Sequence, residues 1–115
     1  MSAAEQFVEQ YARARVVTDS PDAARAVPVV LRYDGRVRVT LPDSSEWIFP
    51  RDLLERGLRS PVTGGDVQIW PCGRVQAVIE FHTRDGVTVM QFDVKALIRF
   101  LRRTYTAVTP ATVTP

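Results

Sequence analysis

The residues best suited to chemistry are Cys72 and His82, which lie at the two ends of one predicted strand. A catalytic cysteine needs a histidine base and a third group that orients the histidine. No such group is evident near His82, and one cysteine with one histidine falls short of a zinc ligand set. Residues 63–66, Thr-Gly-Gly-Asp, lack the Lys-Ser/Thr and the following helix of a phosphate loop. We therefore expect no enzyme, no catalytic residue, no metal site and no cofactor.

A predicted helix over residues 50–58 carries two carboxylates, Asp52 and Glu55, that could act as a catalytic pair. Each of the two is followed four residues later by an arginine, Arg56 or Arg59, and Arg51 precedes Glu55 by the same spacing. Residues with this spacing are neighbours on a helix surface. Three solvated ion pairs are therefore the favoured interpretation of this helix.

The composition is that of one ordinary globular domain. The chain has 115 residues and a net charge of +2, which is too small to indicate nucleic-acid binding by itself. Lys95 is the only lysine among 15 basic residues, and arginine suits carboxylate and phosphate partners, although Arg-favouring codon usage is the preferred explanation of the bias. The single cysteine favours a reducing, cytoplasmic setting. No apolar run is long enough to span a bilayer, so membrane contact is expected only through partners.

Hydrophobic periodicity predicts four strands, a helix, three strands and a second helix. The start of the chain fits helical spacing as well as strand spacing, and we favour a strand because valines are concentrated there. Residues 1–108 are expected to form the domain, and residues 109–115 a disordered Thr/Pro tail. The expected strands are residues 8–18, 29–33, 36–41, 46–49, 67–70, 75–82 and 87–92; the helices are 50–58 and 93–105, with Asp93 as a cap; residues 62–65 are a loop.

Two basic surfaces are candidates for binding a partner. The last predicted helix gathers cations that could bind phosphates or an acidic protein segment, or could simply form a solvated face. A second arginine face is predicted along the strand over residues 36–41. Trp47 and Trp70 lie on predicted strands, where core packing is favoured over an exposed anchor. The candidate partner-binding residues are Arg36, Arg38, Lys95, Arg99, Arg102 and Arg103.

Several short segments, taken in their order and spacing, resemble one known family. They are LRYD at 31–34, WIFPRDLL at 47–54, GL at 57–58, GDV at 65–67, WP at 70–71 and FLRRT at 100–104. Over residues 8–108 the chain resembles the SsgA-like proteins, which are sporulation and cell-division regulators of actinomycetes. The residues that carry the resemblance include Tyr33, Asp34, Trp47, Phe49, Arg51, Asp52, Leu53, Leu54, Gly57, Gly65, Asp66, Trp70 and Pro71.

This resemblance implies both a fold and a function. The fold is α+β, with a seven-stranded, largely antiparallel, barrel-like sheet similar to Whirly and guide-RNA-binding proteins, and two helices in the order ββββ-α-βββ-α. The function is that of a non-enzymatic adaptor, expected as a homotrimer at division septa, that binds septation proteins such as the tubulin-like GTPase FtsZ. No small-molecule substrate is expected. The fold analogy leaves single-stranded nucleic-acid binding as the alternative.

Overall fold

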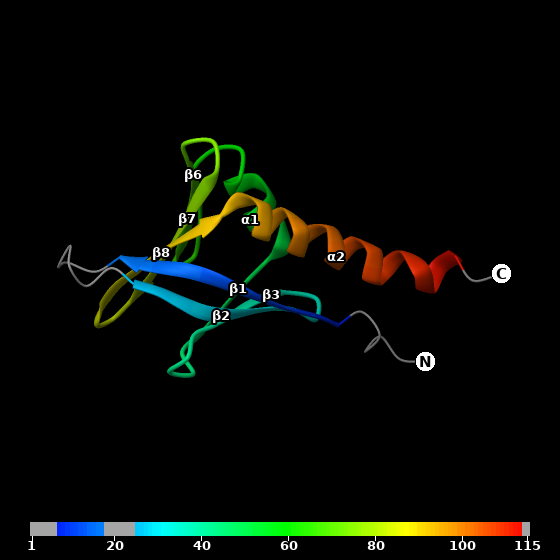
Figure 1. Ribbon diagram of the computed structural model, residues 1–115, viewed down its shortest axis with the longest axis horizontal. Helices are drawn as coiled ribbons and strands as arrows, with labels where there is room; N and C mark the ends of the chain where they lie inside the picture. The colour runs from blue at the N-terminus through cyan, green and yellow to red at the C-terminus, as the bar shows by residue number, and fades with distance from the viewer. Residues whose placement is uncertain (1–6, 18–24, 114–115) are drawn as a thin grey trace.

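The computed structural model describes residues 7–17 and 25–113, with the side chains of the last helix described up to Thr106. These residues form one eight-stranded antiparallel sheet and two helices (Figure 1). The strand order in the sheet is β4-β3-β2-β1-β8-β7-β6-β5. The elements are β1 (Val8–Val17), β2 (Arg25–Tyr33), β3 (Val37–Thr40), β4 (Glu46–Phe49), α1 (Arg51–Gly57), β5 (Val62–Gly64), β6 (Val67–Cys72), β7 (Gln76–Thr83), β8 (Gly86–Asp93) and α2 (Val94–Val113).

β1 is a strand whose side chains alternate between the interior and solvent. Val8 and Ala14 are buried, whereas Tyr11 and Arg13 are exposed. A period of two is the pattern of a half-buried strand, so the preference for a strand over a helix here is confirmed. Residues 1–6, which could begin a helix, lie outside the described residues.

The sheet curls into a nearly closed barrel, as aromatic contacts across its interior show. Trp47 on β4 stacks on Phe81 of β7, with ring centroids 4.4 Å apart and an interplanar angle of 19°. Phe49 on β4 also meets Phe81, at 6.2 Å between centroids. Because β4 and β7 are not neighbours in the sheet, these contacts bring an edge strand against a distant one. The predicted barrel-like class is confirmed, and Trp47 packs into the structure.

The two helices complete the core. Helical spacing predicts one buried face on α2 made of Val94, Leu97, Ile98, Leu101 and Tyr105. Leu97 and Leu101 are buried as predicted, and Phe100 is buried as well, but Ile98 and Tyr105 are exposed. α1 buries Leu53 and Leu54 next to β5 and β6. In Figure 1, α2 runs alongside β1, while α1 lies near the start of α2. The helices thereby leave a junction between them, where part of the candidate site is found.

The sheet contains one more strand than the seven predicted. Residues 62–65 were expected to form a loop, but Val62–Gly64 is strand β5 and pairs with β6, Val62 opposite Ile69 and Gly64 opposite Val67. Three residues are too few to show an alternating pattern. The strand therefore arises from its pairing with β6, which the local sequence does not reveal.

The start of α2 at Val94 agrees with the expectation that Asp93 directly precedes the helix, whereas its end differs. Within the described residues, the Asp93 side chain makes no capping hydrogen bond. The Val94 N–H donates instead to the Val75 carbonyl oxygen at 2.8 Å. The helix continues to Val113, beyond the expected end near residue 105. The disorder of residues 109–115 stays a prediction.

Candidate partner-binding surface

Three of the predicted basic residues share one exposed side of α2. Lys95, Arg99 and Arg102 are all exposed, and their spacing of four and three residues places them in one line along the helix. None of their side chains forms an ion pair or a hydrogen bond within the described residues. We call these three residues the α2 ridge. It is an uncompensated strip of positive charge on the surface.

Arg103, the fourth predicted residue on this helix, has a different role. Its Nη1 donates to the carbonyl oxygen of Glu9 at 3.0 Å and to Gln10 Oε1 at 3.3 Å. Gln10 Nε2 in turn donates to the carbonyl oxygen of Ala96 at 3.0 Å. These bonds fasten α2 to β1. The Arg103 side chain is exposed, but its Nη1 is engaged within the fold, unlike the side chains of the α2 ridge.

The junction of α1 and α2 is built around Arg51. Its guanidinium lies between two aromatic rings, 3.8 Å from the centroid of Tyr105 and 5.0 Å from that of Tyr33. Its Nη1 also donates to Thr104 Oγ1 at 3.4 Å. A cation over a tyrosine ring contributes about 0.5–2 kcal/mol, depending on its exposure to water. One arginine thus joins the end of β2, the start of α1 and the middle of α2.

Tyr105 closes the same junction through its hydroxyl group. The hydroxyl donates to Glu55 Oε2 at 2.6 Å. Donation to this carboxylate raises the pKa of Tyr105, with desolvation as a second cause, while the positive charge of Arg51 opposes the shift. The Glu55 carboxylate on α1 is therefore hydrogen-bonded to a residue of α2.

This arrangement corrects the expected ion pairs of α1. Asp52 and Arg56 form their pair, with Nε and Oδ2 3.0 Å apart. The pairs of Glu55 with Arg51 and with Arg59 do not form, because the aromatic rings hold Arg51 and Tyr105 holds Glu55. Arg59 is exposed, and its side chain has no partner among the residues that the structure describes. The sequence missed this because the competing contacts come from α2, far along the chain.

A groove of about 310 Å³ lies between α1 and α2. We call it the α1–α2 groove. Its apolar part includes Ile98, which remains 37% exposed although it lies on the side of α2 that faces α1. Nothing in the sequence alone distinguished Ile98 from a core residue. The groove is lined by Glu55, Leu58, Arg59, Val94, Ile98 and Leu101.

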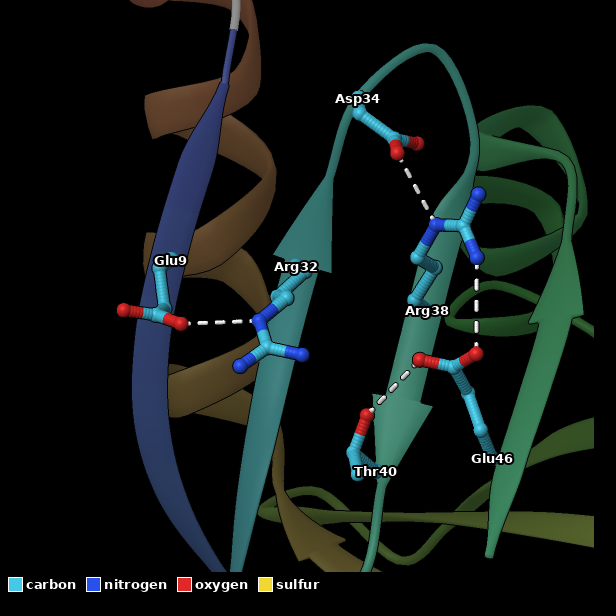
Figure 2. A network of polar contacts seen from close by, with 6 residues as sticks. All are labelled: Glu9, Arg32, Asp34, Arg38, Thr40 and Glu46. Atoms are coloured by element: carbon cyan, nitrogen blue, oxygen red, sulfur yellow. Dashed lines mark hydrogen bonds and ion pairs between the residues drawn. The ribbon is translucent and has the colours of Figure 1, made fainter. Parts of the chain in front are cut away.

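The second predicted arginine face, on the β2–β3 hairpin, is largely neutralised. Figure 2 shows Arg38 between two carboxylates, with Nε 3.0 Å from Asp34 Oδ2 and Nη1 3.5 Å from Glu46 Oε1. Glu46 also accepts a hydrogen bond from Thr40 Oγ1 at 3.2 Å. Arg36 lies in the turn and is exposed. The structure therefore does not bring Arg36 and Arg38 together as a free basic surface.

The outer side of β1 adds a third group of charges. Arg32 Nε lies 2.8 Å from Glu9 Oε2 across the β1–β2 pair (Figure 2). This hydrogen bond to Glu9 raises the pKa of Arg32. Further along β1, Arg13 and Arg15 are exposed and have no side-chain partner in the described part of the chain. They provide a natural comparison for the α2 ridge.

The residues that carried the family resemblance mainly build the scaffold. Gly57 ends α1 where a Cβ would meet Ile69 Cβ at 2.4 Å, so only glycine fits without movement.

A second groove, of about 670 Å³, separates β4 from the β5–β6 turn. Trp70 and Pro71 are half-buried on β6. Motif residues Trp47, Phe49, Asp52, Leu53, Gly65 and Asp66 line that second groove.

The structure separates the two residues of the conceivable nucleophilic pair. Cys72 pairs with Gln76 at one end of β7, whereas His82 lies near the other end. Gln76 and His82 are six positions apart on β7, roughly 20 Å at the usual rise per residue. His82 Nε2 instead lies 2.7 Å from Glu80 Oε1. No group of three His, Cys, Asp or Glu side chains suited to a metal ion occurs among the described residues.

Comparison with known proteins identifies the family. The model of the family described as "Streptomyces sporulation and cell division protein, SsgA" matches residues 19–112. This chain belongs to the SsgA family. The resemblance to the SsgA-like proteins that the sequence motifs indicated is therefore confirmed.

Relatives of this SsgA-family protein are named sporulation-specific cell division protein SsgB. The one from Streptomyces coelicolor is 36% identical over 104 residues, covering 81% of this chain and 76% of the relative. The one from Salinispora tropica is also 36% identical over 104 residues, covering 77% and 72%. These homologues support a role in sporulation septation.

Solved structures support the same assignment. The structure of SsgB described with mutations that correlate to longitudinal cell division during sporulation of Streptomyces coelicolor has a TM-score of 0.79 and 34% identity, covering 92% of this chain and 90% of that one. An SsgA-like sporulation-specific cell division protein from Thermobifida fusca has a TM-score of 0.72 and 30% identity, covering 94% and 86%. Within the described residues, no helix is both long enough and apolar enough to cross a membrane.

Proposed function

We propose that this SsgA-family protein is a non-enzymatic adaptor that helps localise or regulate septum formation by binding division-machinery proteins. FtsZ is the first candidate partner, and division septa are the proposed location. The observation that carries the proposal is the α2 ridge, whose three cations have no compensating partner within the described residues. The names of the homologues supply the process, sporulation-specific cell division.

The α2 ridge has the geometry to attract an extended acidic segment. Lys95 and Arg102 are seven residues apart on one helix, which corresponds to about 10 Å at a rise of 1.5 Å per residue. This length is similar to the Debye length of about 8 Å at physiological ionic strength. The three charges therefore act together on a partner at close range, and binding through them weakens as salt increases.

A homotrimer is part of the proposal. Several copies of the same ridge on one assembly would bind a polymeric partner more tightly than one copy does. Linked sites raise apparent affinity by roughly 10²–10⁴ without any new contact, provided that they can bind simultaneously. Light scattering of the purified protein measures the assembly, and a monomeric mass removes this part of the proposal.

The proposal is tested by measuring binding to purified FtsZ after removing the ridge charges. The test variant replaces Lys95, Arg99 and Arg102 with alanine. The control replaces Arg13, Arg15 and Arg84, which are also exposed and lack side-chain partners in the described chain, so both variants lose three positive charges. We expect the ridge variant to bind about tenfold or more weakly, equivalent to at least about 1.4 kcal/mol.

The control variant should bind FtsZ within about twofold of the wild type, a difference of less than about 0.5 kcal/mol. Equal weakening of both variants would show that only net charge matters. Unchanged binding by the ridge variant removes α2 from the proposal. Absence of binding to FtsZ and to the other septation proteins would contradict the adaptor function itself.

Single-stranded nucleic acid is a second candidate partner, because a strip of cations also suits phosphates. Sequence-tolerant binding of single strands usually adds aromatic rings on which bases stack. Tyr105 follows Arg102 by three residues on α2, which makes it an aromatic neighbour of the ridge, and Arg51 lies over its ring. The Arg51 guanidinium therefore covers the face of the Tyr105 ring on which a base would otherwise stack. A mobility shift of single-stranded DNA or RNA at low salt would support this alternative, and no shift would exclude it.

A further inference from the structure

We infer that the α1–α2 groove binds an acidic peptide segment that carries an aliphatic side chain. This inference rests on the proposed adaptor function, because it names the chemistry of the segment that a partner would insert. The groove combines an apolar floor with a positively charged rim, and the two features lie on the same face of the molecule.

The floor comes from one stripe of α2 and from the end of α1. Val94, Ile98 and Leu101 follow the spacing of four and three residues that places side chains on one side of a helix. Leu58 meets them from the α1 side, and Ile98 is still 37% exposed. The volume of about 310 Å³ is roughly ten times the share of one liquid water molecule. The groove can therefore hold an aliphatic side chain, but not a folded domain.

The rim is basic on both sides. Lys95 and Arg102 precede and follow Ile98 by three and four residues, so they are its neighbours on the helix surface. Arg59 stands on the α1 side and lacks an ion-pair partner within the described residues. The one acidic residue in the lining, Glu55, already accepts a hydrogen bond from the Tyr105 hydroxyl at 2.6 Å.

Charge complementarity therefore selects an acidic occupant. Arg59 lines the groove, Lys95 and Arg102 lie beside Ile98 on α2, and none of these three cations has a side-chain partner within the described residues. The one carboxylate in the lining, Glu55, already accepts a hydrogen bond. A second copy of this chain docked face to face would bring the same cations to the same rim, where like charges repel. A nucleic-acid strand would use the rim but gain nothing from an aliphatic floor. An acidic segment with a leucine-like anchor uses both.

The inference is tested with labelled synthetic peptides and fluorescence anisotropy. The probe peptide has adjacent leucines within a run of aspartate and glutamate. One matched peptide replaces the leucines with serine, and another replaces the acids with lysine. We expect the probe to bind with a dissociation constant below about 1 mM. The serine peptide should bind at least about fivefold more weakly, and the lysine peptide should not bind.

Two variants of the protein locate the binding, each with a matched control. Ile98→Ser removes the apolar anchor site, and Val87→Ser on β8 makes the same change at another exposed apolar residue. Arg59→Glu reverses a rim charge, and Arg13→Glu reverses an exposed charge on β1. The first variant of each pair should lose the probe, and the second should retain it.

Several outcomes would overturn the inference. No binding of the probe by the wild type at about 1 mM, or equal binding by all four variants, excludes the groove as its site. A single-stranded oligonucleotide that is lost with Arg59→Glu but kept with Ile98→Ser would indicate a phosphate site instead. A lower solution mass for Ile98→Ser, with the probe still bound, would indicate self-association.

The inference and the proposed function can fail separately. If FtsZ binding depends on the α2 ridge but is unchanged in Ile98→Ser, the groove is wrong and the adaptor function stands. If the peptide binds the groove but no septation protein binds the full chain, the adaptor function is wrong and the groove stands.

Discussion

Replacement of Gly57 by alanine should destabilise the protein substantially, although alanine is the better helix former. A Cβ at this position would lie 2.4 Å from both Cβ and Cγ2 of Ile69 and 3.2 Å from Val62 Cγ2. Ile69 is fully buried on β6, and its Cβ is fixed to the backbone, so a rotamer change cannot remove the clash. The helix or the strand must therefore shift.

The size of the effect follows from two opposing contributions. Overpacking a filled core costs typically about 1–3 kcal/mol. Alanine returns at most about 1 kcal/mol of helix propensity, and less here because Gly57 is the last residue of α1. We therefore expect a net loss of about 1–2 kcal/mol in the free energy of unfolding. For a domain of this size, that corresponds to a Tm roughly 4–8 °C lower.

The assay is urea denaturation at a fixed protein concentration, followed by circular dichroism. Gly65→Ala is the control: it has a φ of +57° but no atom within 4 Å of the added Cβ. This variant should be destabilised only by the left-handed backbone conformation of its alanine, by about 1 kcal/mol. A Gly57→Ala protein that is as stable as the wild type would refute the close packing of α1 on β6.

The junction between the helices gives two further predictions. Arg51→Ala should lower the free energy of unfolding by about 1–2 kcal/mol, because the cation between two tyrosine rings is lost. Arg51→Lys should lower it by less, because lysine partly replaces that cation. Equal stability of the wild type and both variants in urea would contradict the stacking. In an alkaline spectrophotometric titration, Tyr105 should ionise above the ordinary tyrosine pKa, because its hydroxyl donates a hydrogen bond to the Glu55 carboxylate. A raised pKa in the folded state means that this stabilisation is complete below about pH 10 and is lost as pH rises further. Tyr105→Phe should remove both the late titration and this alkaline loss, and an unchanged titration curve would assign the shift elsewhere.

Where the sequence pattern was local, it predicted the fold well. The alternation of β1, the Pro50 start of α1 and the apolar spacing of α2 each reflect contacts with a single interior, so a few neighbouring residues were enough. β5 was missed because its three residues carry no pattern and become a strand only by pairing with β6. The family resemblance implied the barrel-like class, whereas the order of the strands within the sheet was not predicted.

The candidate site was predicted less completely, for a physical reason. Spacing along α2 identified all four cations, but it could not show that Arg103 is held by the carbonyl of Glu9. The same rule paired Glu55 with Arg59, whereas the Tyr105 hydroxyl takes that carboxylate. Contacts between residues far apart in the sequence decide which surface charges remain available. The α1–α2 groove exists only because two such helices meet.

Site-specific photo-crosslinking to purified FtsZ is the most direct measurement of the central claim, that partners bind at α2 and the adjacent groove. One protein carries a photoreactive amino acid in place of Ile98, and a second carries it in place of Arg13 on the outer side of β1. Both positions are exposed, so both can react with a bound partner. A crosslink to FtsZ from position 98 and not from position 13 is the predicted result. A crosslink from position 13 with none from position 98 would contradict the account.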